Sequence, residues 1–208
     1  MRGRFIVLEG GEGAGKSRLA EALRERLEAA GEQVVVTREP GGTALGEELR
    51  DVLLRHQGLD DPLAELLLFE AARAHLVATV IAPALDAGKT VICDRYTASS
   101  VAYQSSGCGL PREEVDLANA IATRGLEPDL TLLLDVPVDI GLRRRTGDGA
   151  PNHFDAASRE FHERVHAGYA ALAREHAERW RVIDATQPFA VVVEDALRAI
   201  GEVRPLPR

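Results

Sequence analysis

The segment Gly10–Ser17, which reads GGEGAGKS, constrains the fold of this chain more than any other feature. It fits the phosphate-binding pattern G-x-x-x-x-G-K-[ST] at every position. An apolar run precedes it and a helical pattern follows it, which is the context that this loop requires. Glycines let successive N–H groups turn towards phosphate oxygens, and the following helix N-terminus adds positive charge. We therefore expect an ATP-binding loop made of Gly10, Gly11, Glu12, Gly13, Ala14, Gly15, Lys16 and Ser17.

Lys16 is unusual because nearly every other basic residue of the chain is an arginine. Of its 25 lysines and arginines, only Lys16 and Lys89 are lysine. The lysine ammonium is a compact charge that reaches between two phosphates. The planar guanidinium of arginine is bulkier, and its N–H groups point in other directions. Ser17 offers a hydroxyl oxygen to Mg²⁺. The sequence thus predicts a nucleoside triphosphate bound with Mg²⁺, with Lys16 acting on its phosphates.

Five short apolar runs predict β-strands. They are continuous rather than alternating, as in parallel strands that are buried on both faces, and helical patterns separate them. We predict one domain over residues 1–208 with an α/β fold, a doubly wound, five-stranded parallel sheet flanked by helices. The predicted strands are residues 4–9, 33–39, 90–94, 129–136 and 180–185. The predicted helices are residues 18–29, 45–56, 62–87, 112–124, 138–145 and 156–177, and a Gly-rich lid is expected at about 144–158.

The composition excludes several classes of protein. A net charge of −8 does not favour a nucleic-acid binder, and 45% hydrophobic residues are enough for a packed core. No apolar run approaches the ~20 residues of a membrane span. Two cysteines, Cys93 and Cys108, are too few for a disulfide framework, so we expect a reduced, cytoplasmic protein without a membrane partner.

Charged residues stand where the predicted strands end. In open α/β sheets, ligands bind beyond the carboxyl ends of the strands. These residues therefore predict a charged, metal-assisted ligand site at one edge of the sheet. They are Glu9, Arg38 with Glu39, Asp94 with Arg95, Asp135 and Asp184.

Arginines at this edge favour phosphoryl transfer over simple nucleotide binding. Arg38 and Arg95 follow two strands, and residues 143–145 form an Arg-Arg-Arg run beside the predicted lid. Phosphoryl transfer needs two anionic partners held in line under positive charge. A phosphate monoester has a second pKa near ~6, so it needs neutralisation rather than a general base. The arginines therefore favour a monophosphate acceptor.

Two other functions stay open at this point. A kinase with an alcohol acceptor, such as a deoxynucleoside kinase, would use Glu12 or Asp94 as its base. A non-catalytic P-loop module would bind ATP alone. Arg38 and Arg95 argue against the first, because a neutral nucleoside would leave buried arginines unpaired.

Several segments together resemble the thymidylate kinase family: FIVLEGGEGAGKS, TREPGGT, LFEAARAHL, DRYTASSVAYQ, PDLTLLLDVP and DATQP. The resemblance runs from Arg4 to Pro188, and the second and fourth segments are far more specific than the phosphate loop. It implies a nucleoside monophosphate kinase fold, Mg²⁺ with ATP as the donor, and dTMP as the acceptor. The product would be dTDP for dTTP synthesis, and the enzyme would be a homodimer.

The resemblance also implies roles for single residues. Phe69 would stack on thymine, Arg73 would donate to its O4, and Tyr103 would lie under the sugar, where it disfavours a ribose 2′-OH. The other expected dTMP residues are Glu12 at the 3′-OH, Ser99, Ser100 and Gln104 as polar contacts, and Arg38 with Arg95 on the phosphate. The metal would be approached by Ser17, Asp94 and Glu9, and catalysis is assigned to Lys16, Arg95, Arg143, Arg144 and Arg145.

The chain departs from the family in the lid. Bacterial members often carry an Asp-Arg-Φ-Glu pattern there, where Φ is apolar, but residues 152–155 read Asn-His-Phe-Asp. We therefore expect the catalytic lid charge from Arg143, Arg144 or Arg145, or from Arg159 in the next helix. The predicted helix 62–87 is apolar around much of its circumference, which favours burial on two sides and a dimer.

Overall fold

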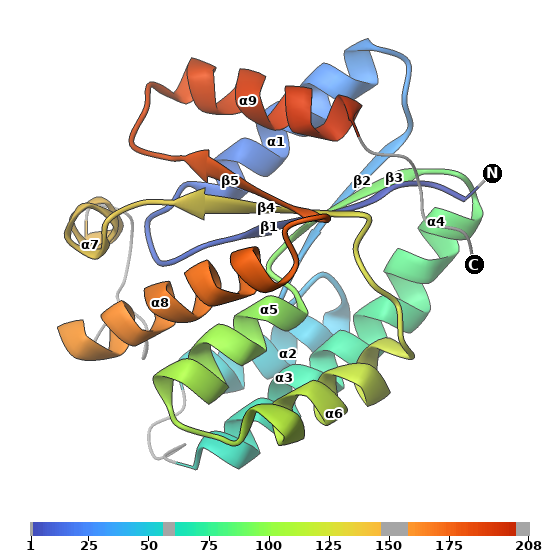
Figure 1. The fold of residues 1–208 in the computed structure, drawn as a ribbon. Helices are drawn as coiled ribbons and strands as arrows, with labels where there is room; N and C mark the ends of the chain where they lie inside the picture. The colour runs from blue at the N-terminus through green and yellow to red at the C-terminus, as the bar shows by residue number, and fades with distance from the viewer. Residues whose placement is uncertain (1, 56–60, 147–157, 203–208) are drawn as a thin grey trace.

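The five strands of the computed structural model, which describes residues 2–55, 61–146 and 158–202, form one parallel sheet. Their order is β2-β3-β1-β4-β5, with β1 in the centre (Figure 1). This confirms the predicted doubly wound α/β architecture. The strands are β1 (Phe5–Glu9), β2 (Val34–Arg38), β3 (Thr90–Asp94), β4 (Leu130–Asp135) and β5 (Trp180–Asp184).

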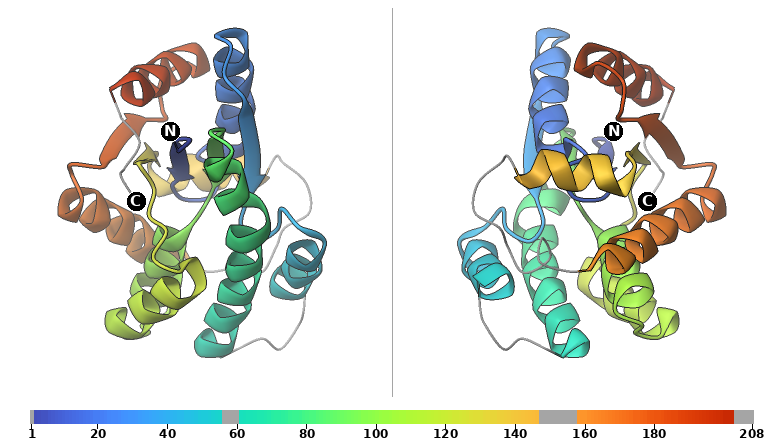
Figure 2. Two further views of the ribbon diagram at one scale, coloured as in Figure 1. Left: turned by 90° about the vertical axis from the view of Figure 1, so that its right-hand side faces the viewer. Right: turned by 90° about the vertical axis from the view of Figure 1, so that its left-hand side faces the viewer.

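Two helices cover one face of the sheet: α1 (Lys16–Ala29) and α9 (Phe189–Gly201) (Figures 1 and 2). Leu19 and Leu23 of α1 pack with Val192 and Ala196 of α9 in one apolar cluster against the strands. The sequence prediction missed α9, although its buried residues follow the spacing of an amphipathic helix.

The other face of the sheet carries most of the remaining helical elements (Figure 2). Their buried side chains form two clusters, one around Tyr103, Val115 and Tyr169 and one around Phe5 and Leu76. The elements are α2 (Ala44–Arg55), α3 (Pro62–Leu76), the π-helical segment η1 (Val77–Ile81), α4 (Ala82–Asp86), α5 (Thr97–Ser100), the π-helical segment η2 (Val101–Gly107), α6 (Arg112–Thr123) and α8 (Arg159–Glu175).

The short helical layer of α5 and η2 is a second departure from the sequence prediction. Its sequence, TASSVAYQSSG, contains four serines and shows no clear amphipathic period. Burial of Val101, Ala102 and Tyr103 beneath α8 holds it in place, so tertiary packing outweighs weak local propensity.

By length and composition, the described stretch Pro62–Asp86 could also cross a membrane, with a mean hydropathy of 1.5. A core helix of a globular protein passes the same test. Here Leu66, Leu76 and Ile81 are almost fully buried within the domain.

Helix α7 (Val138–Thr146) lies against the phosphate loop because two glycines meet there. A Cβ on Gly13 would stand 1.9 Å from the carbonyl oxygen of Gly141. A Cβ on Gly141 would in turn stand 2.4 Å from the carbonyl oxygen of Glu12. Gly13 also has φ of +67°. Only glycine permits this approach, which brings the arginines of α7 close to the loop.

Candidate active site

The phosphate loop (residues 10–17) joins β1 to α1 at the centre of the sheet. The Lys16 ammonium donates to the carbonyl oxygens of Gly10 at 3.0 Å and Gly11 at 2.9 Å. Burial, together with repulsion from Arg95, lowers the pKa of Lys16 to about 8. The lysine is therefore folded onto the loop, within reach of any phosphate that the loop holds.

Ser17 and Asp94 form the oxygen pair best suited to Mg²⁺. The Ser17 hydroxyl donates to Asp94 Oδ2 at 2.5 Å, next to the phosphate loop. Mg²⁺ prefers hard oxygen ligands, and in kinases it takes one or two protein groups, waters and substrate phosphates. No cluster of three or more His, Cys, Asp or Glu side chains suitable for a metal occurs in the described residues. One carboxylate and one hydroxyl are the number of protein groups that Mg²⁺ takes when substrate phosphates and waters supply its other ligands.

Glu9, which was expected near the metal, lies close enough to Lys16 to counteract part of the burial that lowers the pKa of that lysine, and it is held by residues of α5 and α8. Its buried carboxylate accepts hydrogen bonds from the Tyr96 N–H at 2.9 Å, the Ser99 hydroxyl at 2.7 Å and the Tyr169 hydroxyl at 3.0 Å. Burial raises its pKa. The hydrogen bonds of Glu9 hold the start of α5 and tie it to α8, so the structure does not pair Glu9 with Ser17 or Asp94.

Asp135 is likewise occupied elsewhere. Its Oδ1 lies 2.7 Å from Nε2 of His166 in α8. Asp94, which the family resemblance favours as the carboxylate near the metal, instead contacts Ser17 of the phosphate loop.

Arg95 links the third strand to the phosphate loop. Its Nη2 donates to Glu12 Oε1 at 2.7 Å, and the Tyr103 hydroxyl donates to the same oxygen at 2.9 Å. Burial alone would raise the pKa of Glu12, but Arg95 and Lys16 lower it to about 2. Arg95 also has φ of +72°, a conformation that is costly for a side chain of this size and that clusters at functional sites.

A pocket opens beside this pair. Most of the residues expected at dTMP line it, and several unexpected ones do as well. The expected residues are Glu12, Phe69, Arg73, Arg95, Ser99, Ser100, Tyr103 and Gln104, and the unexpected ones are Glu39, Pro40, Arg50 and Leu54. We call this the acceptor pocket.

Arg38 is not among the residues that line the acceptor pocket. It is 53% exposed and pairs with Glu47 at 2.9 Å. It lines a neighbouring groove together with Ser17 and Asp94. Arg50, whose Nη1 donates to the Pro40 carbonyl at 2.8 Å, lies in the acceptor pocket instead. Burial lowers the pKa of Arg50, and Arg38 and Arg95 both lie close enough to lower it further, so Arg38 stands beside the acceptor pocket, and its role on the dTMP phosphate stays a prediction.

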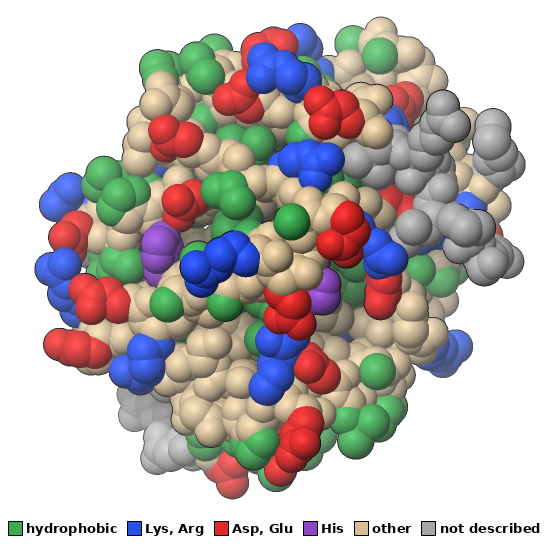
Figure 3. All heavy atoms as spheres, in the orientation of Figure 1, with side chains coloured by type: hydrophobic (Ala, Val, Ile, Leu, Met, Phe, Trp, Pro, Cys, Tyr) green, Lys and Arg blue, Asp and Glu red, His purple; other side chains and the backbone are tan. Residues whose placement is uncertain are grey.

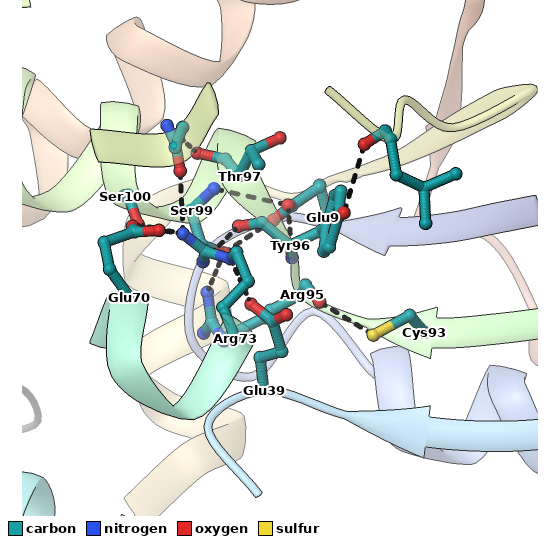
Figure 4. A network of polar contacts seen from close by, with 12 residues as sticks. Glu9, Glu39, Glu70, Arg73, Cys93, Arg95, Tyr96, Thr97, Ser99 and Ser100 are labelled. Atoms are coloured by element: carbon teal, nitrogen blue, oxygen red, sulfur yellow. Dashed lines mark hydrogen bonds and ion pairs between the residues drawn. The ribbon is translucent and has the colours of Figure 1, made fainter. Parts of the chain in front are cut away.

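Arg73 forms a buried polar network at the end of the acceptor pocket (Figure 4). Its guanidinium donates to Glu39 Oε2 at 2.7 Å, to Asn119 Oδ1 at 2.7 Å, to Ser100 Oγ at 2.9 Å and to Glu70. Two carboxylates thus share one cation, and Oε1 of Glu39 and Oε2 of Glu70 have no hydrogen-bond partner within residues 2–55, 61–146 and 158–202. Burial, offset only in part by Arg73, raises the pKa of Glu39 to about 7.

Gln104 is oriented by a further buried carboxylate. Its Nε2 donates to Glu65 Oε1 at 2.7 Å. The amide therefore keeps its carbonyl oxygen for another donor, such as a base edge.

The comparisons with known proteins now decide the family. The thymidylate kinase family model matches residues 8–196. A thymidylate kinase of Desulfovibrio desulfuricans is 51% identical over 94% of both chains, and one of Deinococcus radiodurans is 47% identical over 97% of this chain and 98% of the relative. A thymidylate kinase crystal structure from Ehrlichia chaffeensis has a TM-score of 0.79 and 33% identity, and it covers 96% of this chain and 99% of that one.

The chain belongs to the thymidylate kinase family.

Within that family's fold, Arg144 and Arg145 of α7 have different partners. Arg144 donates to the Ala185 carbonyl at 2.9 Å, on the side of the loop after β5. Arg145 is near enough to Glu12 to lower the pKa of that carboxyl. Arg159 is bound on the surface by Asp139 and Glu163. Most of the predicted lid, including residues 147–157, lies outside the described residues.

Several site residues were missed because their sequence signal is ambiguous. Arg50 resembles a solvated charge on an amphipathic helix, and Glu70 resembles an ordinary surface carboxylate. Glu39 was predicted only as one of the charged residues at the strand ends, without its contact to Arg73. Arg18 stacks its guanidinium 3.8 Å above the ring of Phe189, just after the segment DATQP. A buried arginine needs buried acceptors, so Arg73 could have predicted carboxylates nearby but not which ones.

Proposed function

We propose that the chain transfers the γ-phosphoryl group of Mg²⁺-ATP to dTMP and forms dTDP, as a single kinase domain with its lid at about residues 144–158. The observation that carries this proposal is the position of the acceptor pocket. It lies next to the phosphate loop and is lined by a ring, Phe69, by the buried cation Arg73, and by Arg95, which pairs with Glu12 of the loop. The pocket thus offers a ring for a base and a cation beside the loop for a phosphate.

The phosphate of dTMP would be held by Arg95 and Arg50. In the structure, Arg95 is paired with Glu12, so an incoming phosphate competes for this guanidinium. Glu12 is then free to accept from the sugar 3′-OH. Arg38 would contribute from the adjoining groove beside Ser17 and Asp94.

The base and sugar would be read by the rest of the pocket. Phe69 stacks on thymine, while Arg73 and Ser100 lie at the base edge with Gln104. Tyr103, 5% exposed, packs under the sugar, and its hydroxyl is fixed by Glu12. A ribose 2′-OH would be placed against the buried Tyr103 side chain, which disfavours ribonucleotides.

Transfer requires positioning and positive charge rather than a base on the protein. The dTMP phosphate is largely dianionic at neutral pH and is itself the nucleophile. Lys16 and the N–H groups of the phosphate loop would hold the donor phosphates, and Arg95 would hold the acceptor. Arg145, turned towards Glu12, is the α7 arginine best placed to stabilise charge on the transferring group.

Mg²⁺ would be held by Ser17 and Asp94, with Glu9 supporting them through α5 rather than as a ligand. The ion supplies charge neutralisation for the donor phosphates. The chain's own contribution is the orientation of the Ser17 hydroxyl by Asp94.

A cytoplasmic homodimer completes the proposal. Four large apolar side chains on α3 and α6 are 45% to 70% exposed: Leu63, Leu67, Leu117 and Ile121. Such exposure on neighbouring helices is typical of a surface that a second copy covers. Light scattering at micromolar concentration would contradict the dimer by giving the monomer mass.

An ADP-release assay with a panel of acceptors tests the function. With Mg²⁺-ATP we expect strong turnover on dTMP, weak turnover on UMP and none on thymidine. Turnover on thymidine would support a deoxynucleoside kinase that uses Glu12 or Asp94 as a base. ATP binding without turnover on any acceptor would support a non-catalytic ATP-binding module.

A further inference from the structure

Glu65 of α3 is a carboxylate that is only 3% exposed. It stands one helical turn before Phe69 and two before Arg73, so the three side chains leave the same side of the helix. Phe69 and Arg73 line the acceptor pocket, whereas Glu65 does not. On the face of the molecule seen in Figure 3, acidic side chains instead lie among basic ones in contact with solvent. Burying a carboxylate is costly, so the contacts of Glu65 indicate its role.

Gln104 of η2, which lines the acceptor pocket, donates a hydrogen bond to Glu65. Its Nε2 lies 2.7 Å from Glu65 Oε1, and the Gln104 side chain is buried as well. A glutamine amide has one donor end and one acceptor end, whereas an ionised carboxylate only accepts. Glu65 therefore takes the NH₂ end of the amide and leaves the carbonyl oxygen on the other side.

The carbonyl oxygen of the Gln104 side chain reaches open space. Within residues 2–55, 61–146 and 158–202, no donor is hydrogen-bonded to this Oε1 atom. It is nevertheless not one of the side-chain atoms that are sealed from solvent without a partner. The cavity that Gln104 lines is the acceptor pocket. The pocket therefore receives a hydrogen-bond acceptor from Gln104 rather than a donor.

The pyrimidine bases differ in what their N3 atom offers to such an oxygen. Thymine and uracil carry a hydrogen on N3, whereas N3 of cytosine has only a lone pair. A carbonyl oxygen accepts from the first and repels the second. Gln104 could donate to cytosine if its amide rotated by half a turn, but its oxygen would then face the Glu65 carboxylate. Two buried acceptors would be left against each other without a hydrogen between them, which is costly.

We propose that Glu65 is a positioning residue that sets the pyrimidine specificity of the acceptor pocket. It acts through Gln104 and does not touch the base. By fixing the Gln104 amide, it makes the pocket accept bases that have a hydrogen on N3 and reject cytosine. This selection at N3 adds to the one that Arg73 exerts at C4 of the base. The orientation of the amide is a property of the free protein, whereas its effect on specificity rests on the proposed function.

Neutron diffraction of the perdeuterated wild-type protein tests the orientation of the amide without any turnover. We expect the two deuterons of the Gln104 amide on the nitrogen nearest Glu65, with one of them directed at the carboxylate. Amide deuterons directed into the acceptor pocket, or a deuteron on Glu65 that points at Gln104, would overturn the proposal. This measurement needs neither a variant nor a substrate, so it separates failure of the Glu65 contact from failure of the proposed function.

Specificity is tested with Glu65→Gln, because a glutamine of almost the same shape can donate or accept and so allows either orientation of the Gln104 amide. One probe is 5-methyl-dCMP, which differs from dTMP only at N3 and C4. The other is dUMP, which keeps the N3 hydrogen and lacks the methyl group. We expect the kcat/KM ratio of dTMP to 5-methyl-dCMP to fall about tenfold and that of dTMP to dUMP to stay within about twofold. An unchanged first ratio, or an equal fall of both, would overturn the proposal.

Glu65→Asp is the second variant at this position. It keeps the charge but is one methylene shorter and loses the contact with the amide, so it should repeat the fall of the first ratio. It also replaces Glu65→Gln if that variant does not fold. The control is Glu48→Gln, which removes a carboxylate at an exposed position of α2 and should keep both ratios. A shift of the first ratio in the control as large as in the Glu65 variants would overturn the proposal.

A double variant shows whether Glu65 acts through Gln104. In a Gln104→Met background, Glu65→Gln should change the first ratio less than about twofold, because the amide that Glu65 positions is gone. A further fall of the ratio in that background, as large as in the protein with Gln104, would overturn the positioning role.

Discussion

Arg95 and Glu12 form an ion pair of 2.7 Å that joins the end of β3 to the phosphate loop. The pair is largely buried, and its partners come from segments that would bind the acceptor and the donor. Any phosphate that binds Arg95 therefore alters the environment of a residue within the ATP loop. This relationship gives acceptor and donor sites a direct physical connection.

Glu12→Gln should weaken recognition of the sugar 3′-OH. The Glu12 carboxylate is a charged acceptor that takes two hydrogen bonds, whereas the glutamine amide oxygen is neutral and accepts hydrogen bonds more weakly. We expect the preference for dTMP over its 3′-deoxy analogue, measured as a ratio of kcat/KM, to shrink about tenfold. An unchanged ratio would remove Glu12 from the sugar site, whatever happened to overall activity.

Arg145→Ala should reduce kcat about a hundredfold, because removal of one charge-stabilising donor has an effect of this order. The KM for dTMP should change less than threefold. Arg143→Ala, at a more exposed position of the same helix, is the control and should have a smaller effect. The assignment of Arg145 fails if its kcat falls less than tenfold, about 1.4 kcal/mol of barrier, or if Arg143→Ala has the larger effect.

Arg50→Ala should raise the KM for dTMP about tenfold and leave the KM for ATP within about twofold, because Arg50 lines the acceptor pocket. Arg55→Ala is the matched control on the same helix, where Arg55 is exposed and paired with Asp51. Steady-state kinetics of both variants measure the two KM values. Equal KM values in the two variants would contradict a role for Arg50 in acceptor binding.

Glu39 should make the protein less stable as pH rises through neutrality. Its pKa is raised to about 7 in the folded state, so the folded chain binds more protons than the unfolded chain between pH ~4.5 and 7. Its stabilising contribution is thus full below pH ~4.5 and is lost as pH rises through 7. Glu39→Gln does not titrate, so wild type should lose stability relative to this variant between pH 5 and 8.

Calorimetry of wild type, Glu39→Gln and Glu47→Gln across that range supplies the measurement. Glu47 is the control because its pKa is lowered, by the Gly42 N–H and Arg38, so its contribution changes only at more acid pH. A pH-independent difference between wild type and Glu39→Gln would show that Glu39 does not titrate near neutrality.

The sequence predicted much of this architecture because its strongest signals are local. The phosphate loop, the five apolar runs and the residues at strand ends follow from spacing and residue type, and the sheet confirms them. The α5–η2 layer was missed because packing under α8 determines it, not its own sequence.

The same contrast holds in the acceptor pocket. Phe69 and Arg73 are four residues apart on one helix, so their shared face could be predicted. Arg50, not Arg38, lines the acceptor pocket. This difference depends on how α2 packs and on which arginine pairs with Glu47. The partnership of Arg73 with Glu39 and Asn119 joins residues far apart in the chain, which no local pattern contains.

The most direct test of the central claim is the fate of the γ-phosphoryl group. The protein is incubated with γ-labelled ATP, Mg²⁺ and either dTMP or thymidine, and the products are separated. We predict that the label appears in dTDP and that thymidine remains unlabelled. Label in thymidine monophosphate, or only in inorganic phosphate, would contradict an arginine-held monophosphate acceptor and the function built on it.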